Sequence, residues 1–313
     1  MRLSTKYLVF SLALLVLRPT FAELPIFKNP GSHASIAHGK NLTILVSGDS
    51  LVAGYRAGQE SSVVLDVEEG APLSAVGVLA KEIAAHYPEI KVELILRSPG
   101  IDTNGVSNCQ VIPEQRRIVQ SPPSAKQTIR IIRDGVGGNN ALRLLARWNK
   151  QEYLRFPKNE IPLEHWRADI VILMLGVNDS LGGFSPLECY PSIRGKNAPD
   201  LKTRGEPTEI FAMQLNNIVA RVRGMQRKPE LFLATPPIGH FWGRESAERY
   251  AEELRKVALK TRTHLIDAAQ EMETGTAGCA HDWYRGGDCI HLSDKGYEMM
   301  GKILFQGLLK SSR

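Results

Sequence analysis

The sequence predicts an α/β fold with a mainly parallel sheet. Short continuous apolar runs recur along the chain, and stretches with apolar residues at helical spacing separate them. Unbroken apolar runs of this length are typical of strands that are covered on both faces. Strands that alternate with helices favour a parallel sheet with right-handed crossovers. The 43% apolar and 23% charged residues are ordinary for a soluble globular chain, and they exclude a disordered, collagen-like or coiled-coil protein.

The elements follow one another in a regular order along the chain. The expected strands are the apolar runs at 42–46, 92–96, 129–132, 170–175, 231–234 and 265–266. The expected helices are 73–87, 141–148, 208–225, 246–259 and 293–309. Two stretches rich in proline and glycine, 98–126 and 180–207, interrupt this order and are interpreted as large insertions. No repeat or linker divides the chain, so we expect one domain over 41–313 after an irregular lead-in at 23–40.

The N-terminus has the layout of a secretory signal peptide over residues 1–22. Arg2 and Lys6 precede an apolar run at 7–17, and the small residue Ala22 offers a cleavage site. The run is shorter than the ~20 residues that a membrane span requires. We therefore expect cleavage after Ala22, a secreted or periplasmic protein, and no stable membrane span in the mature chain. An uncleaved N-terminal anchor is the alternative.

The net charge and the cysteine content indicate which partners and which disulfides to expect. Removal of residues 1–22 takes away three basic and no acidic residues, so the net charge falls from +6 to +3. So small a charge does not favour a nucleic-acid partner. An even number of cysteines in an exported chain suggests disulfides, with three possible pairings. Cys279 with Cys289 and Cys109 with Cys189 is the preferred pairing, and buried free thiols are the alternative.

Two short polar motifs follow expected strands in the first half of the chain. The first is Gly-Asp-Ser-Leu at 48–51, where a serine on a strand-to-helix turn presents its hydroxyl at the carboxyl edge of the sheet. A serine that caps a helix is the alternative. The second is Gly-Val-Gly-Gly-Asn-Asn at 135–140, whose glycines expose backbone N–H donors. A tight turn with Asn139 or Asn140 as the helix cap is the alternative.

Two further motifs lie in the second half. In Gly-Val-Asn-Asp at 176–179, Asn178 carries two N–H donors that could stabilise an oxyanion, or it could simply occupy a turn. In Asp-Cys-Ile-His at 288–291, Asp288 can hold the imidazole of His291 as a general base requires. A metal-ligand pair is a disfavoured alternative, because only the neighbouring residues 281–282, His-Asp, could extend it. No metal site is expected.

In this order, the four motifs resemble the four blocks of the SGNH (GDSL) hydrolase superfamily. The resemblance covers the chain from about Leu42 to the final helix, and it implies a flavodoxin-like, three-layer α/β/α fold. It implies that Ser50 is the nucleophile, that His291 is the general base and that Asp288 orients His291. The insertions at 98–126 and 180–207 depart from the small members of the family, so the substrate side is non-standard here.

The same resemblance implies an oxyanion hole and a feature that shapes the cleft. The oxyanion hole would consist of the backbone N–H groups of Ser50 and Gly138 and the side chain of Asn178. Another glycine of the 135–138 run, Gly137 or Gly135, would take the place of Gly138 if the register differs. The Thr-Pro-Pro sequence at 235–237, after the next strand, also resembles a family feature beside the cleft.

Such a site hydrolyses an ester through an acyl-enzyme and requires no metal or organic cofactor. We expect an exported serine esterase that removes short O-acyl groups, O-acetyl first among them, from an acylated glycan. The polar insertion at 180–207 favours a hydrophilic substrate. Trp242, Trp283 and Tyr284 could stack on sugar rings, and packing in the core or at its rim is the alternative for each of them. A lipolytic enzyme of lysophospholipase or thioesterase type is one alternative. An inactive glycan-binding module on the same fold is another.

Overall fold

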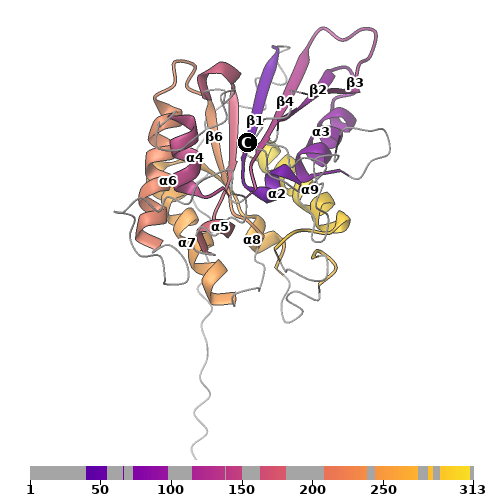
Figure 1. Cartoon of the computed structure of the whole chain (residues 1–313). Helices are drawn as coiled ribbons and strands as arrows, with labels where there is room; N and C mark the ends of the chain where they lie inside the picture. Colours follow the sequence, from indigo (N-terminus) through magenta and orange to yellow (C-terminus); the bar gives the residue numbers. More distant parts are fainter. Residues whose placement is uncertain are drawn as a thin grey trace, which may run out of the picture.

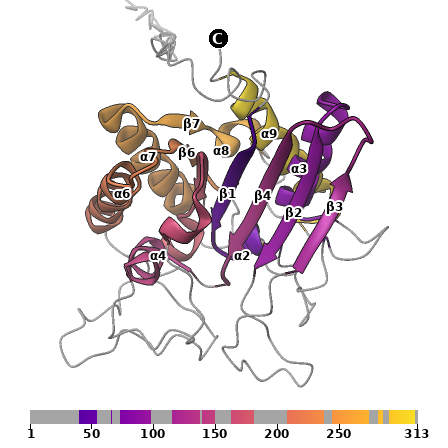
Figure 2. The same cartoon turned by 90° about the horizontal axis from the view of Figure 1, so that it is seen from above.

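A seven-stranded sheet with helices on both faces forms the centre of the molecule (Figure 1 and Figure 2). The computed structural model describes residues 40–54, 66, 73–97, 115–137, 139–149, 163–180, 208–237, 244–273, 281–284 and 290–310. Within these residues the three layers agree with the predicted α/β class, which is confirmed.

The strand order in the sheet is β3-β2-β4-β1-β5-β6-β7. All neighbouring pairs are parallel except β2 and β3, which are antiparallel. The strands are β1 (Leu42–Gly48), β2 (Lys91–Arg97), β3 (Gln115–Gln120), β4 (Thr128–Gly135), β5 (Ile170–Met174), β6 (Glu230–Ala234) and β7 (His264–Ile266). Every residue of β5 is buried. An unbroken apolar run is what a strand with both faces covered needs.

Helices cover the two faces of the sheet and enclose two hydrophobic cores (Figure 1 and Figure 2). One face carries α3 (Ala75–His86) and α9 (Asp294–Lys310), and the other carries α4 (Ala141–Trp148), α6 (Thr208–Arg223) and α7 (Arg244–Thr261). The short helices are α2 (Ser50–Ala53), α5 (Val177–Ser180), α8 (Ala268–Glu271) and the 3-10 helix η2 (Leu163–Trp166). In β1, Ile44 and Val46 belong to the first core and Leu45 to the second, because successive side chains of a strand point to opposite faces.

The three central strands bring distant motifs to one edge of the sheet. Gly48, the last residue of β1, pairs with Gly135 on β4 and with Met174 on β5. The chain leaves parallel strands at the same edge of a sheet, where open α/β folds bind their ligands. The segments that follow β1, β4 and β5 therefore begin side by side.

The stretch at 98–126 differs from its prediction as an irregular insertion. Residues 115–120 form the edge strand β3, which pairs with β2. This strand is polar and alternates between partly buried and exposed residues, and the side chain of Ile118 is 47% exposed. An edge strand that is open on one side lacks the apolar run by which the buried strands are recognised.

Some predictions concern residues outside those that the structure describes. Among them are the signal peptide at 1–22, residues 181–207 of the second insertion, and the cysteines Cys109, Cys189, Cys279 and Cys289. Among the described helices, none combines the length and the apolar character that crossing a membrane demands.

Candidate active site

Ser50 is the first residue of α2, directly after β1. The preceding residue, Asp49, caps this helix, because its Oδ1 accepts a hydrogen bond of 2.9 Å from the backbone N–H of Leu51. The alternative in which Ser50 is the cap is therefore wrong. The serine hydroxyl is not needed by the helix and is available for another partner.

Two glycines allow the strand ends and α2 to approach closely. A Cβ atom at Gly48 would lie 2.2 Å from the carbonyl oxygen of Met174. A Cβ atom at Gly135 would lie 2.1 Å from the backbone nitrogen of Ala53. Gly135 is thus required where α2 packs against β4, which explains this glycine without a role in oxyanion binding.

Ser50 and His291 meet although 241 residues separate them in the sequence. His291 Nε2 lies 3.0 Å from Ser50 Oγ, within hydrogen-bond reach. Ser50 is 5% exposed and His291 is partly buried. The histidine precedes α9, and a bridge between Tyr284 and Leu292 ties its segment to residues 281–284. Asp288, the predicted partner of the imidazole, lies outside the described residues.

Asn178 lies in α5, at the end of the neighbouring strand β5, and is 6% exposed. Its Nδ2 donates a hydrogen bond of 2.9 Å to the carbonyl oxygen of Asn139. The turn before it requires Gly176, whose φ of 125° is one that other residues rarely adopt. The next residue, Asp179, accepts a hydrogen bond of 3.0 Å from the backbone N–H of Ala141 at the start of α4.

The glycine run after β4 is described on both sides of Gly138, which itself lies outside the described residues. Asn140 is the N-cap of α4, since its Oδ1 accepts a hydrogen bond of 2.8 Å from the backbone N–H of Arg143. Asn139 has a different role, because its Nδ2 donates to the carbonyl oxygen of Gly48 at 3.1 Å. The sequence left open which asparagine caps the helix, and the structure assigns the cap to Asn140.

Asp49 is a fully buried carboxyl group beside the serine. Burial raises its pKa to about 7, and the hydrogen bond from Leu51 and the charge of His291 oppose this only in part. Among the described residues, Asp49 Oδ2 has no hydrogen-bond partner. A carboxyl group with its pKa raised to about 7 therefore lies directly beside Ser50, which the sequence did not predict.

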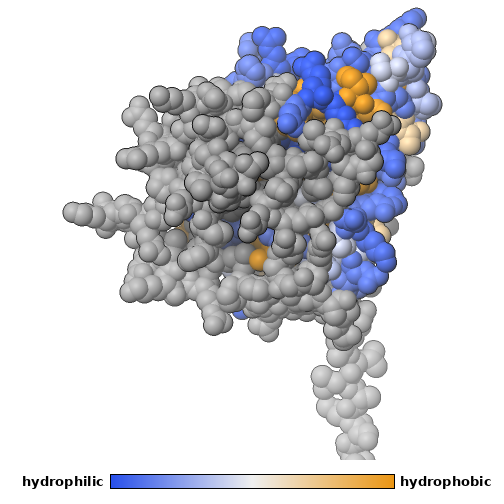
Figure 3. Space-filling model, turned by 45° about the vertical axis from the view of Figure 1, so that its right-hand side comes forward, coloured by the Kyte–Doolittle hydropathy of each residue, from blue (hydrophilic) through white to orange (hydrophobic). Residues whose placement is uncertain are grey.

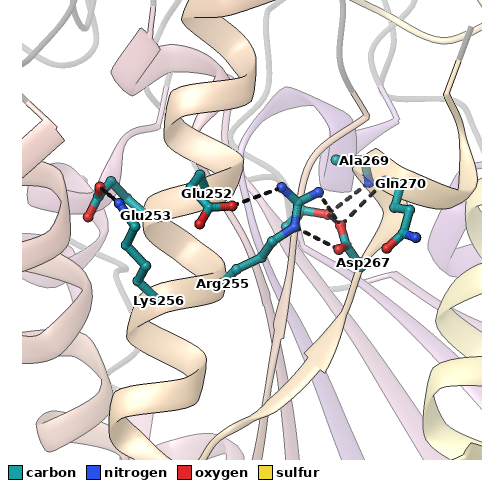
Figure 4. A network of polar contacts seen from close by, with 8 residues as sticks. Glu252, Glu253, Arg255, Lys256, Asp267, Ala269 and Gln270 are labelled. Atoms are coloured by element: carbon teal, nitrogen blue, oxygen red, sulfur yellow. Dashed lines mark hydrogen bonds and ion pairs between the residues drawn. The ribbon is translucent and has the colours of Figure 1, made fainter. Parts of the chain in front are cut away.

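A polar network around Asp267 (Figure 4) binds Thr235, the first residue of the Thr-Pro-Pro segment at 235–237, at the end of β6. The hydroxyl of Thr235 donates to Asp267 Oδ1 at 3.0 Å and accepts from the backbone N–H of Ala269 at 2.8 Å. Arg255 reaches across from α7 and binds both oxygens of Asp267, at 2.7 and 2.9 Å. The network holds the segment beside the turn at Gly176, where a Cβ atom would lie 3.5 Å from the ring of Pro236.

The aromatic residues predicted to bind sugar lie in different surroundings. Tyr284 is 5% exposed and belongs to the first core, so its ring has no face for a sugar and its predicted role in binding is not supported. Burial also raises the pKa of its hydroxyl above the usual range. Trp283 is partly buried and packs against the same core. Trp242 lies outside the described residues.

His281 and Asp282, which left a metal site open as an alternative, each have other partners. The ring of His281 lies 4.1 Å from that of Trp283, centroid to centroid. Asp282 forms an exposed ion pair of 2.8 Å with Lys295. Over the part of the chain that the structure describes, no three His, Cys, Asp or Glu side chains gather as metal ligands would.

The α/β fold brings a serine and a histidine into contact at one edge of its sheet, and comparison with known families identifies the class of protein. The model of the GDSL-like lipase/acylhydrolase family matches residues 103–299, more than half of the chain. The chain therefore belongs to this family, and it is a hydrolase of ester bonds. The matched range includes His291 and Asn178 and begins after Ser50, which lies within hydrogen-bond reach of His291.

Solved structures with the same fold include enzymes of this kind. A lipase/acylhydrolase from Enterococcus faecalis has a TM-score of 0.50 and 17% identity, over 85% of this chain and 94% of that chain. An acetylxylan esterase from Geobacillus stearothermophilus has a TM-score of 0.52 and 16% identity, over 86% of this chain and 95% of that chain. At such identities the likeness establishes the fold. No curated protein matches this chain.

Proposed function

We propose that the protein is an exported serine esterase in which Ser50 is the nucleophile, His291 the general base and Asp288 the group that orients His291. The observation that carries this proposal is the distance of 3.0 Å between Ser50 Oγ and His291 Nε2. With its proton on Nδ1, the imidazole accepts the hydrogen bond of the serine hydroxyl at Nε2.

The reaction follows from this pair. As Ser50 Oγ attacks the ester carbonyl carbon, its proton passes to His291 Nε2 and a tetrahedral oxyanion forms. The imidazolium then gives this proton to the leaving alcohol as the C–O bond breaks, which leaves an acyl-enzyme. A water molecule attacks the acyl group with His291 again as base, and the acid and the free serine are released.

The oxyanion would be held by three donors: the backbone N–H groups of Ser50 and Gly138 and the side chain of Asn178. Support comes from the sheet, in which the carboxyl ends of β4, β1 and β5 are neighbours. Asn178 uses one of its two N–H groups on the carbonyl oxygen of Asn139, and the second remains for the substrate. Loss of one such donor lowers the rate by about 10²–10³.

For the substrate, we propose a short O-acyl ester, with acetate as the first candidate, on a carbohydrate alcohol. The polar residues of the second insertion support a hydrophilic substrate, and one protein of the same fold is an acetylxylan esterase. On the face in Figure 3, the described residues are mostly hydrophilic, and apolar residues form small separate spots. A lipase-like enzyme would need a wide apolar patch, which the sequence of the second insertion does not supply. A lipolytic enzyme is the second candidate, since another protein of this fold is a lipase/acylhydrolase.

Two experiments test the site and the substrate separately. A fluorophosphonate probe should label the wild type and spare Ser50→Ala, and His291→Ala should lose nearly as much activity as Ser50→Ala because the two groups act as a unit. Labelling of another serine would refute the site. Activity on p-nitrophenyl esters should peak at acetate or propionate. A rise toward octanoate would favour the lipolytic enzyme, since each buried methylene contributes about 0.8 kcal/mol.

Export and the disulfides are proposed on the sequence alone. N-terminal sequencing of secreted protein should begin after Ala22, and an intact Met1 would refute the cleavage. Peptide mapping without reduction should link Cys279 to Cys289, a bridge that would close a loop of about ten residues and stabilise the fold by roughly 3 kcal/mol. Recovery of Cys289 as a free thiol would refute this pairing.

A further inference from the structure

A chain of buried hydrogen bonds crosses the ends of the three strands that carry the site. The carbonyl oxygen of Gly48, two residues before Ser50, accepts the N–H of Val136 at 3.1 Å and Nδ2 of Asn139 at 3.1 Å. The carbonyl oxygen of Asn139 then accepts Nδ2 of Asn178 at 2.9 Å. Asn139 is thus bonded to both neighbouring segments, one through its side chain and one through its main chain.

The chemistry of the partners fixes how both amide groups point. A carbonyl oxygen can only accept, so the NH₂ group of Asn139 faces Gly48 and the NH₂ group of Asn178 faces Asn139. Asn139 is 2% exposed and Asn178 is 6% exposed, so water cannot easily replace either bond. Hydrogen bonds between buried groups are costly to leave unmade.

Asn139 is not needed to begin the helix that follows it. The cap of α4 is Asn140, through its bond of 2.8 Å with the N–H of Arg143. The backbone N–H of Asn139 donates to the carbonyl oxygen of Val136 at 3.0 Å, which closes the turn that contains Gly138. The side chain of Asn139 therefore serves the link between the turn and β1.

We propose that Asn139 is a positioning residue of the oxyanion hole, which ties the turn that contains Gly138 to the segment of Ser50 and orients the donor of Asn178. The proposal rests on the proposed function. Without the bond to Gly48, the turn can move relative to β1, and two of the three donors move with it. Because Asn139 acts through other donors, its loss should reduce the rate constant of the chemical step more than substrate binding.

A double-mutant cycle tests this role with p-nitrophenyl acetate as substrate. Asn139→Ala should lower kcat by about 10- to 100-fold, somewhat less than the 10²–10³ expected for a lost donor, and change KM by less than about threefold. In the Asn178→Ala background the same substitution should cost clearly less, because one donor that it positions is already gone. Losses that multiply in full would overturn the proposal.

The adjacent asparagine provides a matched control. Asn140→Ala removes a helix cap and should lower the melting temperature about as much as Asn139→Ala. It should leave kcat within about twofold of the wild type, because its side chain bonds within α4 and makes no link to β1 or β5 among the described residues. An equal loss of kcat in both variants would show that stability of the turn, and not the link to Gly48, determines activity.

A conservative variant tests the direction of the hydrogen bond. In Asn139→Asp the neutral carboxyl group can donate to the carbonyl oxygen of Gly48, and the carboxylate cannot. Burial should raise the pKa of this carboxyl group, so the kcat of the variant relative to the wild type should fall as the pH rises from about 6 to 9. A ratio that stays near one throughout this range would overturn the proposal. If Asn139→Ala does not fold, the kcat ratio of Asn139→Asp to the wild type tests the proposal by itself.

The outcomes separate the two proposals. Full activity of Ser50→Ala would refute the proposed function and the role of Asn139 with it. If Ser50→Ala and Asn178→Ala lose activity and Asn139→Ala does not, only the role of Asn139 is refuted.

Discussion

Replacement of Asp49 by asparagine should change how the stability of the protein depends on pH. The carboxyl group is fully buried, and burial raises its pKa to about 7. In the unfolded chain an aspartate has a pKa of about 3.9. Asparagine is a close mimic of the neutral form, since its Oδ1 can still accept the hydrogen bond that Leu51 donates at 2.9 Å.

The sign and the size follow from these two pKa values. Between about pH 4 and pH 7, the folded chain keeps a proton on Asp49 that the unfolded chain has released, so the free energy of unfolding falls as the pH rises. Each pKa unit corresponds to about 1.36 kcal/mol, which makes the whole fall about 4 kcal/mol. The amide of Asp49→Asn binds no such proton, so the variant should gain up to this amount relative to the wild type between about pH 4 and pH 8.

Urea unfolding of both proteins at several pH values measures this difference directly. The difference between the two profiles isolates Asp49 together with its interaction with the charge of His291. Asp282→Asn is the control: its side chain is exposed and paired with Lys295, which lowers its pKa, so any effect should be small and of opposite sign. Parallel profiles for the wild type and Asp49→Asn would refute the buried, proton-binding carboxyl group.

Three further substitutions test how the strand ends are held. Arg133→Met should lower the free energy of unfolding, measured in urea, by about 3–5 kcal/mol, because it removes the guanidinium that now lies 2.7 Å from the buried carboxylate of Asp66. A loss below about 1 kcal/mol would contradict this. Gly48→Ala should lower the melting temperature by the equivalent of about 1–3 kcal/mol or more, since its Cβ would meet the backbone of Met174, and an unchanged melting temperature would show that the strands can separate. Thr235→Val should lower the free energy of unfolding by about 1–3 kcal/mol, because it removes a buried hydroxyl that bonds to both Asp267 and Ala269, and Thr235→Ser should restore most of this loss.

The parts of the fold that the sequence predicted are those that depend on local pattern. The run at 170–175 corresponds to β5, which spans Ile170–Met174, because both faces of this strand are covered and no polar residue interrupts it. The strand at 115–120 was missed, because an edge strand with one open face needs no such run. The motif at 48–51 was found because a serine at a strand end is a local signal, but its contact with His291 depends on the whole fold.

Buried polar residues were the least predictable part of the structure. Asp66 and Arg133 form an ion pair that is 0% and 1% exposed at the side chain, yet 67 residues separate them in the sequence. A single sequence carries no signal that couples two such positions. Asn139 was noticed only as a possible helix cap, because an asparagine before a helix is favoured there whatever else it does. Only the placement of β1 beside β4 gives its amide the carbonyl oxygen of Gly48 as a partner.

The strand order explains why the donors of the proposed oxyanion hole would be physically coupled. In the order β4-β1-β5, the segment of Ser50 lies between the segments that follow β4 and β5. The position of each donor therefore depends on bonds to the neighbouring segments. Asn139 spans the first gap through Gly48, and its main chain holds Asn178 from the far side. Register errors in one strand would move every side chain that follows it. A site built across three strand ends therefore needs bonds between the segments themselves, and Asn139 provides two of them, one from its side-chain amide and one from its main-chain carbonyl.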